Sequence, residues 1–459
     1  MRRRSTPAED PTVRPDDLFR ARLETQIDLR HPLARLACCM PWTALEEALS
    51  CTLPAPTVSG GGRPALPVRL MAGLLYLKHA YDLSDEAVCE RWLENPYWQF
   101  FTGETYLQTE LPIDPSSLTR WRQRIGEEGV ELLLAVTIEA ARTAGLIKRA
   151  SLDKVIVDTT VMPKAIAHPT DSRLLERSRQ HMVKFAQDHG LSLRQNYNRE
   201  APRFATQVGR YAHAKQYKRM RAAIKTLRTR VGRVQRDVQR QLTKLPEPLQ
   251  AKGADLLQRV GRILTQKTKD KNKLYALHAP EVECISKGKA RNPYEFGVKV
   301  TVATTLKEGL VVGMRSMPGN PYDGHTLDET IEQVGILADQ RPRTVMVDKG
   351  YKGAEVDGVQ ILRSGQRRGV TRTMKAMIKR RSAIEPTIGH MKSDGRLDRN
   401  PLKGALGDAL HAVLCGAGHN IRLLLSLLRL FAAYLRSVAL AWMGRFVGGR
   451  APQSALVAG

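Results

Sequence analysis

Three carboxylates that lie far apart in the chain occupy places where a strand or a helix is expected to end or turn. They are Asp158 in the segment VIVDTT, Asp348 in VMVDKGY and Glu385 in RRSAIEPTIGHMK. In the first two segments an apolar run leads directly into the Asp, which is typical of a buried central strand that delivers an acid to the carboxyl edge of a sheet. These acids are therefore the first candidates for a catalytic site.

Carboxylates that meet at one place repel each other unless a cation lies between them. Mg²⁺ takes carboxylate oxygens and keeps waters and phosphate oxygens as its other ligands. The formal net charge of +27 and the pI near 10.1 indicate a polyanionic partner. Two Asp and one Glu in so basic a chain predict phosphoryl transfer on nucleic acid by two metal ions, Mg²⁺ with Mn²⁺ expected to substitute.

The composition narrows the ways in which the chain can bind nucleic acid. Aromatic residues are 5% of the chain, so broad stacking of bases is not expected and contact with the backbone of duplex DNA is favoured. The six cysteines show no CxxC pair and no Cys/His ligand spacing. They indicate buried or free thiols in a reducing cytosol, not a zinc site or a disulfide framework.

Neither end of the chain predicts insertion into a membrane. The N-terminal residues lack the apolar core of a secretory signal. The most apolar tract, residues 421–447, is interrupted by arginines, so its longest uncharged run is far shorter than a membrane span. These arginines are Arg422, Arg429, Arg436 and Arg445. We expect a docking helix within a C-terminal helical segment, residues 406–459, with a coiled or oligomeric contact as the alternative.

The first third of the chain is predicted to be helical. Residues 1–60 are expected to form a partly extended arm with one helix around 42–49. A boundary at the glycines near Gly60 then opens a helical domain over residues 61–145. Its last helix, LTRWRQRIGEE, has arginines in its first turns, which favours a DNA-binding helix-turn-helix; an ordinary solvated helix is the alternative. These arginines are Arg120, Arg122 and Arg124.

Residues 171–280 form a strongly basic insertion. They contain 26 Lys and Arg against 8 Asp and Glu, a net charge of +18 out of the chain's +27. Apolar residues recur at helical spacing between Tyr211 and Leu242, which predicts a long helix or a helical hairpin with one apolar stripe. A solvated charged face is the alternative, but so one-sided a charge favours a surface for the DNA backbone. The arginines expected to contact DNA are Arg228, Arg230 and Arg233.

From residue 281 the apolar period changes to two. Alternating apolar residues from Phe296 to Val302, followed by a turn at Gly309, predict a hairpin. Thr326 has the spacing of a capping box with Glu329. Together with the two strands that lead to an Asp and the helix that contains Glu385, this order predicts an α/β fold, a mixed sheet flanked by helices. It places a catalytic domain over residues 150–405, interrupted by the insertion 171–280.

With the acids in these places, the chain resembles the RNase H-like DDE transposases of bacterial insertion sequences. Around the last acid it resembles the branch with a Tyr-x2-Arg-x3-Glu-x6-Lys signature, since Arg381, Glu385 and Lys392 have that spacing. The stretches NPYEFGVKV, from Asn292, and GNPYDGHTL, from Gly319, are also similar to this family. The resemblance covers roughly residues 60–425.

The chain departs from the family at two points. The Tyr of the signature is replaced by Ile378, which leaves the acids unchanged and puts any role of that Tyr in doubt. Some relatives have a β-rich insertion between the second and third acids, whereas only 36 residues separate Asp348 from Glu385 here.

The resemblance implies an RNase H-like sheet whose three acids are the catalytic ligands of two Mg²⁺ ions. It also implies that Arg381 and Lys392 contact DNA. Lys392 lies two helical turns beyond Glu385, so both point the same way, and a cation beside the metal site can hold a DNA phosphate. His325 follows Asp323-Gly324 and is a weaker candidate for the border of the site.

Each of these residues also has a structural alternative. Asp158 and Asp348 could simply end strands and begin turns. Glu385 could complete a capping box with Ser382, and Arg381 could pair with it as a helical neighbour. Lys392 could be a surface lysine, and a single loop histidine is more often structural.

The pattern predicts a transposase that binds the ends of its element, hydrolyses the 3′ ends and joins them to target DNA. Its partner would be double-stranded DNA, both the terminal inverted repeats and the target, bound by a homodimer or a larger assembly. We expect a cytoplasmic, nucleoid-associated bacterial protein with no membrane partner. The alternatives are a metal-dependent nuclease of the same fold without strand transfer, and a non-catalytic DNA-binding relative.

Overall fold

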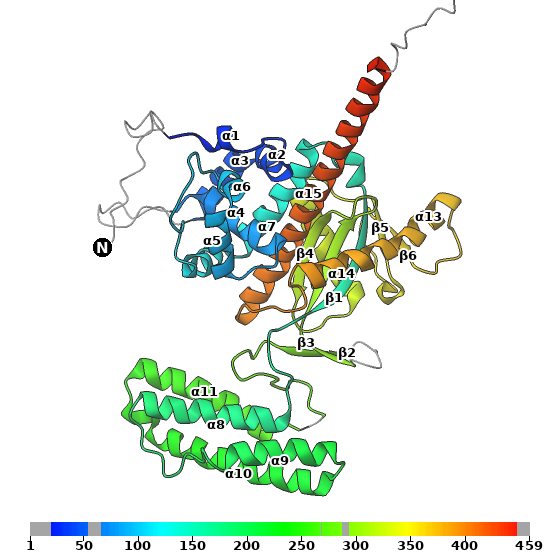
Figure 1. Ribbon diagram of the computed structural model, residues 1–459. Coiled ribbons are helices and arrows are strands. Elements are labelled where there is room, and N and C mark those ends of the chain that lie inside the picture. Colours follow the sequence, from blue (N-terminus) through cyan, green and yellow to red (C-terminus); the bar gives the residue numbers. More distant parts are fainter. Residues whose placement is uncertain (1–19, 54–65, 268, 287–292, 448–459) are drawn as a thin grey trace, which may run out of the picture.

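The computed structural model describes residues 20–53, 66–267, 269–286 and 293–447 (Figure 1). At its centre is a six-stranded mixed sheet. Its strands pair in the order β2-β3-β1-β5-β6, and β4 pairs with β3. The strands are β1 (Lys154–Pro163), β2 (Glu283–Ser286), β3 (Tyr294–Thr305), β4 (Val311–Met317), β5 (Thr344–Val347) and β6 (Gln360–Arg363). The mixed α/β architecture predicted from the sequence is confirmed.

Strand β1 lies between an antiparallel and a parallel neighbour, and this arrangement brings two of the acids together. It is antiparallel to β3 and parallel to β5, with Val155 opposite Val345. Residues 155–157 and 345–347 are buried, as expected for central strands. Strand β1 continues to Pro163, so the expectation that Asp158 ends a strand is wrong. The parallel register, which pairs Ile156 with Met346, places Asp158 beside Asp348, directly after β5.

The predicted hairpin is confirmed as β3 and β4, which are antiparallel and joined through Gly309 in the left-handed region, φ 72°. The capping box at Thr326 is wrong in detail. Helix α12 (Leu327–Ala338) begins where expected, but Asp323–Thr326 forms a 3-10 turn and the Thr326 hydroxyl donates to the Asp323 carbonyl. The Thr326 side chain accepts no capping hydrogen bond from the helix.

The N-terminal helices share one hydrophobic core with the sheet. Their bounds are α1 (Leu23–Gln26), α2 (Pro32–Cys39), α3 (Trp42–Thr52), α4 (Val68–Ala80), α5 (Asp85–Glu94), α6 (Pro96–Phe101) and α7 (Ser116–Thr143). Helix α3 was expected, whereas α2 was not, although its buried Leu33, Leu36 and Ala37 have helical spacing. Residues 20–53 are thus packed against the body and are not an extended arm. Residues 1–19 and the predicted boundary at Gly60 lie outside the described residues.

Helix α7 contains the predicted DNA-reading segment. Residues 102–115 separate it from α6, a longer connection than the three or four residues of a helix-turn-helix. Gly126, at φ 62° and ψ −162°, interrupts the helix, so Ser116–Ile125 is a separate first segment. Helix α7 packs against α12 and α15, which lie beside the sheet.

The basic insertion folds as a helical bundle with a hydrophobic core of its own, which lies apart from the sheet (Figure 1). Its helices are α8 (Asp171–Asp188), α9 (Ala201–His213), α10 (Tyr217–Gln241) and α11 (Glu247–Thr265). The predicted apolar stripe is confirmed on α10, where Leu227, Val231, Val234 and Val238 are buried. Lys164, directly after β1 on the way to the bundle, is buried. It pairs with Glu281 at 2.8 Å and with Asp408 at 2.7 Å.

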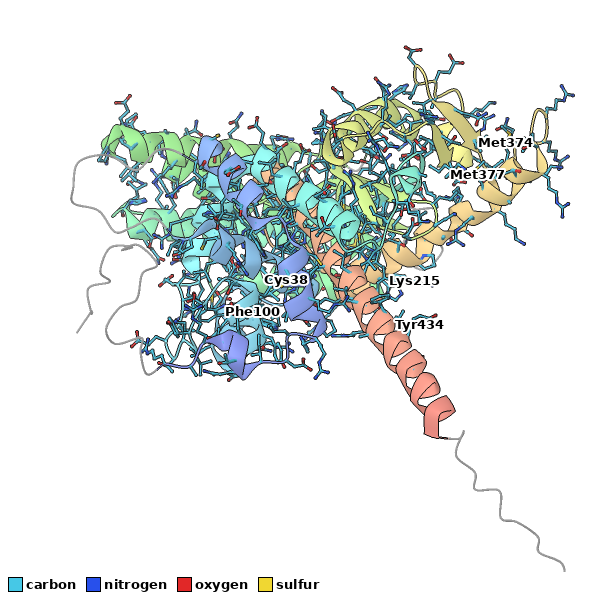
Figure 2. The ribbon with its side chains drawn as sticks, turned by 90° about the horizontal axis from the view of Figure 1, so that it is seen from above. Cys38, Phe100, Lys215, Met374, Met377 and Tyr434 are labelled. Carbon is cyan, nitrogen blue, oxygen red and sulfur yellow. The ribbon has the colours of Figure 1, made fainter. Side chains whose placement is uncertain are left out.

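The long helix α15 (Gly404–Val447) is a core helix that extends beyond the body. It packs against α7, α4, β4 and α2. Residues 404–434 are long and apolar enough to cross a membrane by length and composition, but 67% of the most apolar window is buried in the protein. Figure 2 shows Tyr434 where the helix leaves the body, with Met374 and Met377 on a different projecting helix, α13 (Arg372–Arg380). The side chains of Arg436 and Arg445 lie outside the described part.

Candidate active site

The three acids reach the site from three elements. Asp158 lies within β1, and its Oδ1 accepts the Thr159 amide at 2.8 Å. Asp348 follows β5 and begins a 3-10 turn over Lys349–Tyr351. Glu385 is the second residue of α14 (Ile384–Asp394). The sheet therefore fixes two carboxylates, and a helix packed beside β1 supplies the third.

The guanidinium of Arg381 connects all three acids. Its Nη1 lies 3.1 Å from Asp158 Oδ2, and its Nη2 lies 2.9 Å from Glu385 Oε1 and 4.0 Å from Asp348 Oδ1. Arg381 is in a short 3-10 turn, Arg381–Ala383, between α13 and α14. The signature arginine thus lies between the three carboxylates.

The donor set suits a hard divalent cation, because all three acids offer carboxylate oxygens and the site is open to solvent. The exposed fraction of the side chain is 20% for Asp158, 48% for Asp348 and 63% for Glu385. Such exposure leaves room for the waters and phosphate oxygens that Mg²⁺ retains. The acids surround Arg381 and do not form a compact ligand cluster. In the described part of the chain, the three His, Cys or acidic side chains close enough to share one ion are His79, His411 and Cys415, which are buried elsewhere.

The environment of the acids shifts their protonation equilibria. Burial raises the pKa of Asp158 above its ordinary value, and the charge of Asp348 adds to this, whereas the Thr159 amide and Arg381 oppose it. Burial also raises the pKa of Tyr351 far above that of a free phenol, helped by Asp158 and Asp323, so this side chain remains protonated. A positive charge beside Asp158 favours its ionised form, and Arg381 supplies such a charge.

A fourth acid, Asp323, lies beside the site and was not predicted. Its Oδ1 accepts from Thr159 Oγ1 at 3.1 Å and from Lys299 Nζ at 2.9 Å. A Cβ added to Gly350 would lie 3.1 Å from Asp323 Oδ2, so this glycine allows the turn after Asp348 to approach. Asp323 lies in the stretch GNPYDGHTL, whose resemblance to the family is the sequence signal that pointed to it.

The predicted neighbours of the acids have different positions. Lys392 lies on α14 with its Nζ 3.9 Å from Glu295 Oε2. His325 packs edge-on against Tyr322, with ring centroids 5.4 Å apart, a structural contact. Ile378, at the position of the signature Tyr, is half-buried against the main core. The capping alternative for Glu385 is wrong, since the helix begins at Ile384 and the Ser382 hydroxyl instead donates to the Lys379 carbonyl.

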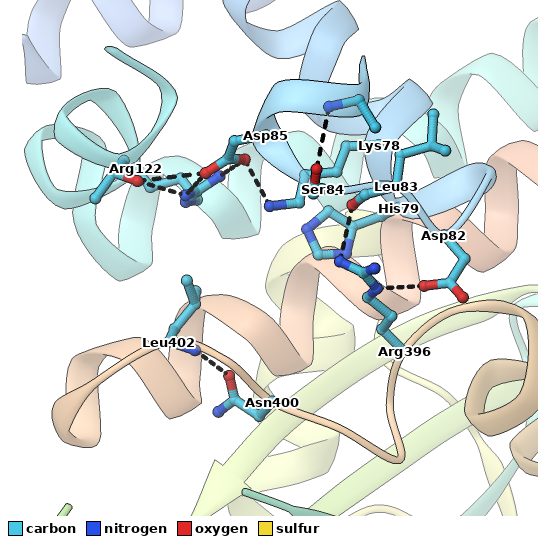
Figure 3. A network of polar contacts seen from close by, with 12 residues as sticks. Lys78, His79, Asp82, Leu83, Ser84, Asp85, Arg122, Arg396, Asn400 and Leu402 are labelled. Atoms are coloured by element: carbon cyan, nitrogen blue, oxygen red, sulfur yellow. Dashed lines mark hydrogen bonds and ion pairs between the residues drawn. The ribbon is translucent and has the colours of Figure 1, made fainter. Parts of the chain in front are cut away.

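Of the three arginines predicted to contact DNA from α7, Arg122 is buried (Figure 3). Its guanidinium donates two hydrogen bonds to Asp85, at 2.8 and 2.6 Å, and Lys78 also pairs with that carboxylate. Burial would raise the pKa of Asp85, but these two cations lower it to about 2. Arg122 therefore joins α7 to α4 and α5 and cannot reach DNA without breaking this pair. Arg120 and Arg124 are exposed.

The three arginines predicted to contact DNA from the insertion also differ. Arg230 stacks over the Tyr197 ring, 5.0 Å from its centroid, and pairs with Glu200 at 3.2 Å. Arg228 is half-buried, whereas Arg233 is exposed and donates to Tyr197 Oη at 3.3 Å. Arg233 also borders a pocket of about 340 Å³, lined by Arg194, Gln195, Tyr197, Arg236, Asp237 and Arg240. Of the three, Arg233 is thus the exposed one, and it lies beside Arg236 and Arg240, which the sequence did not single out.

Two segments of the chain match families of transposase domains. Residues 21–124 match a family described as a transposase domain (DUF772), and residues 262–421 match the transposase DDE domain. The uncharacterized protein ORF8 in nfe locus of Rhizobium meliloti is 51% identical over 212 residues, 45% of this chain and 98% of that protein. No solved structure matches the chain significantly. The DDE domain implies an RNase H-like fold, the class to which the mixed sheet belongs. The chain belongs to the DDE transposases.

The two matched ranges leave a gap that contains Asp158 and most of the basic insertion. Asp348, Arg381 and Glu385 fall inside the DDE match, whereas Asp158 lies between the two matches. The case for Asp158 therefore depends on its position, 3.1 Å from the same guanidinium that contacts Glu385.

Proposed function

We propose that this transposase binds the ends of an insertion sequence, hydrolyses the phosphodiester at each 3′ end and joins the freed ends to target DNA. The observation that supports this proposal is the meeting of three carboxylates around Arg381 at one edge of the sheet. The three acids would hold two Mg²⁺ ions, which activate a water and stabilise the leaving 3′ oxygen.

The chain's own residues orient the substrate in this proposal. Asp158 and Asp348 are fixed by paired strands, so their separation is set by the sheet. Glu385 and Lys392 lie two helical turns apart on α14 and so share a face. In this proposal the Lys392 ammonium, which lies 3.9 Å from Glu295 Oε2, holds a phosphate as a point charge. A freed 3′ hydroxyl can then occupy the place of the water, so one site serves both hydrolysis and strand transfer. No covalent bond between protein and DNA is required.

The proposal is tested with the full chain, Mg²⁺, duplexes that carry the terminal repeats of its element, and a supercoiled target plasmid. We expect cleavage at the 3′ ends and joined products that contain both DNAs. Cleavage without joining would assign the chain to metal-dependent nucleases of the same fold. Binding without cleavage would assign it to non-catalytic DNA-binding relatives.

End recognition is proposed to involve the exposed face of the first segment of α7. Arg120 and Arg124 are four residues apart and share a helical face, and Arg120 donates to Ser116 Oγ at 2.6 Å. A bidentate contact between Arg and guanine contributes about 1–3 kcal/mol of discrimination. We therefore expect Arg120→Ala or Arg124→Ala to reduce the preference for the element's ends over random DNA by about 5- to 150-fold in competition binding.

The control for this experiment is Arg142→Ala, at the far end of the same helix, where the side chain pairs with Glu139. Arg122→Ala is unsuitable, because it would leave Asp85 with one cation and disturb folding. If Arg120→Ala and Arg124→Ala both keep the wild-type specificity ratio, the ends are recognised by another part of the chain.

A further inference from the structure

We propose that Arg381 is an internal counter-cation that occupies the acid cluster in the DNA-free protein and is displaced when divalent metal binds. This inference rests on the proposed function. In addition, the binding of metal would release Arg381 from the acids, and the released side chain would turn toward the DNA. Arg381 would thus neutralise the acids before metal binds and contact DNA afterwards.

The contacts of Arg381 show why it and a metal ion exclude each other. Its guanidinium donates to Asp158 Oδ2 and Glu385 Oε1, and so occupies the space between these two acids. Mg²⁺ requires ligand oxygens at about 2.0–2.1 Å in a nearly octahedral arrangement. Each carboxylate has a second oxygen, but an ion bound this closely to both acids would lie beside the guanidinium, and the two cations would repel each other.

The charges around the site favour the exchange of Arg381 for a divalent metal ion. Three carboxylates face one guanidinium, so the DNA-free cluster keeps a net negative charge that attracts further cations. Lys299, the nearby lysine, is already paired with Asp323 and donates to the Pro321 carbonyl. Arg381 is thus the cation that the described contacts place among the three acids.

The backbone around Arg381 is held by its neighbour, while its side chain, itself 11% exposed, lies against an acid that faces solvent. The neighbouring Arg380 donates to the carbonyl oxygens of Leu306 and Lys307, at 2.8 and 2.7 Å, and so ties the turn to the β3–β4 loop. Glu385 is exposed, which leaves a path from the cluster to solvent. A displaced guanidinium would therefore stay beside the site, where its planar donors suit a DNA phosphate.

The test measures Mn²⁺ binding to the full, DNA-free chain by calorimetry or electron paramagnetic resonance. With the competing cation removed, we expect Arg381→Gln to bind Mn²⁺ about tenfold more tightly than the wild type and yet to cleave DNA more slowly. Arg381→Lys keeps the charge but cannot span three acids, so its affinity should fall between the two. The matched control is Lys349→Gln, which removes a cation beside Asp348 that forms no ion pair with the acids in the described contacts.

The outcomes separate this inference from the proposed function. If Arg381→Gln and Arg381→Lys bind Mn²⁺ no more tightly than the wild type, the exchange is wrong, whatever the cleavage assay shows. An equal gain in Lys349→Gln would also overturn it, because the effect would then be one of general charge. If the wild type never cuts element ends but Arg381→Gln still binds Mn²⁺ more tightly, the proposed function fails and the exchange stands. Arg381→Lys provides the affinity comparison if Arg381→Gln does not fold.

Discussion

Asp158→Ala, Asp348→Ala and Glu385→Ala are each expected to lower the rate of DNA cleavage by at least about a thousandfold, or about 4 kcal/mol in activation free energy. The reason is that each carboxylate would hold metal at the reacting phosphate. Affinity for DNA should remain near that of the wild type, because it comes from the basic surfaces and not from these acids. Cleavage of end-labelled duplex and gel-shift binding measure the two effects on the same preparations.

A suitable control for this series is Glu355→Ala, since Glu355 is an exposed acid in the segment that follows Asp348 but makes none of the Arg381 contacts. It should cleave like the wild type. Glu385 provides the sharpest test because it is the most exposed of the three acids. Cleavage by Glu385→Ala near the wild-type rate in Mg²⁺ would mean that the third ligand has been assigned to the wrong residue.

The edge of the sheet could be predicted from the sequence because it depends on local pattern. Two runs of three apolar residues that end in Asp can be buried on both faces only in a central strand, and β1 and β5 are such strands. Parallel pairing of these strands then places both acids at one edge. The third acid was predicted because the spacing of Arg381, Glu385 and Lys392 resembles the family signature, and one turn and one helix contain these residues.

Contacts between distant segments could not be predicted in this way. The position of Arg381 between three carboxylates depends on how α14 packs beside β1, which the sequence of either element does not specify. The arginines of α7 illustrate the same limit. On a helix, Arg122 points away from Arg120 and Arg124 because it lies two residues from each. The helix spacing does not show that the side chain of Arg122 meets Asp85, which lies 37 residues earlier in the chain.

The basic insertion was correctly predicted to be helical, but the choice of its DNA-facing arginines depended on which helices pack together. Arg230 lies near Tyr197 because Arg179, which is buried, holds the loop before α9 through Asn196 and Asn198. That loop covers part of α10 and leaves a different row of arginines exposed. Charge counts show how much a segment attracts DNA, whereas packing decides which side chains reach it.

A row of three arginines on α10 remains exposed. Arg233, Arg236 and Arg240 lie three and four residues apart on α10, so they share a face, and with Arg194 they border one pocket. Asp237, the single acid among the lining residues, is buried and paired with Arg240. The row therefore keeps a net positive charge, as expected of a surface that holds successive DNA phosphates. We expect the combined change of Arg233, Arg236 and Arg240 to Gln to weaken binding to specific and random duplex alike.

The salt dependence of binding makes this prediction quantitative. Each phosphate contact that is lost reduces the slope of log K against log salt by about 0.9 in magnitude, so three contacts should reduce it by about 2–3. The control changes Lys244, Lys252 and Lys267 to Gln, which removes the same charge from exposed positions outside the pocket. Its slope should change less than that of the arginine variant. An unchanged slope in the arginine variant, with its helical content preserved, would mean that this face of the bundle contacts something other than DNA.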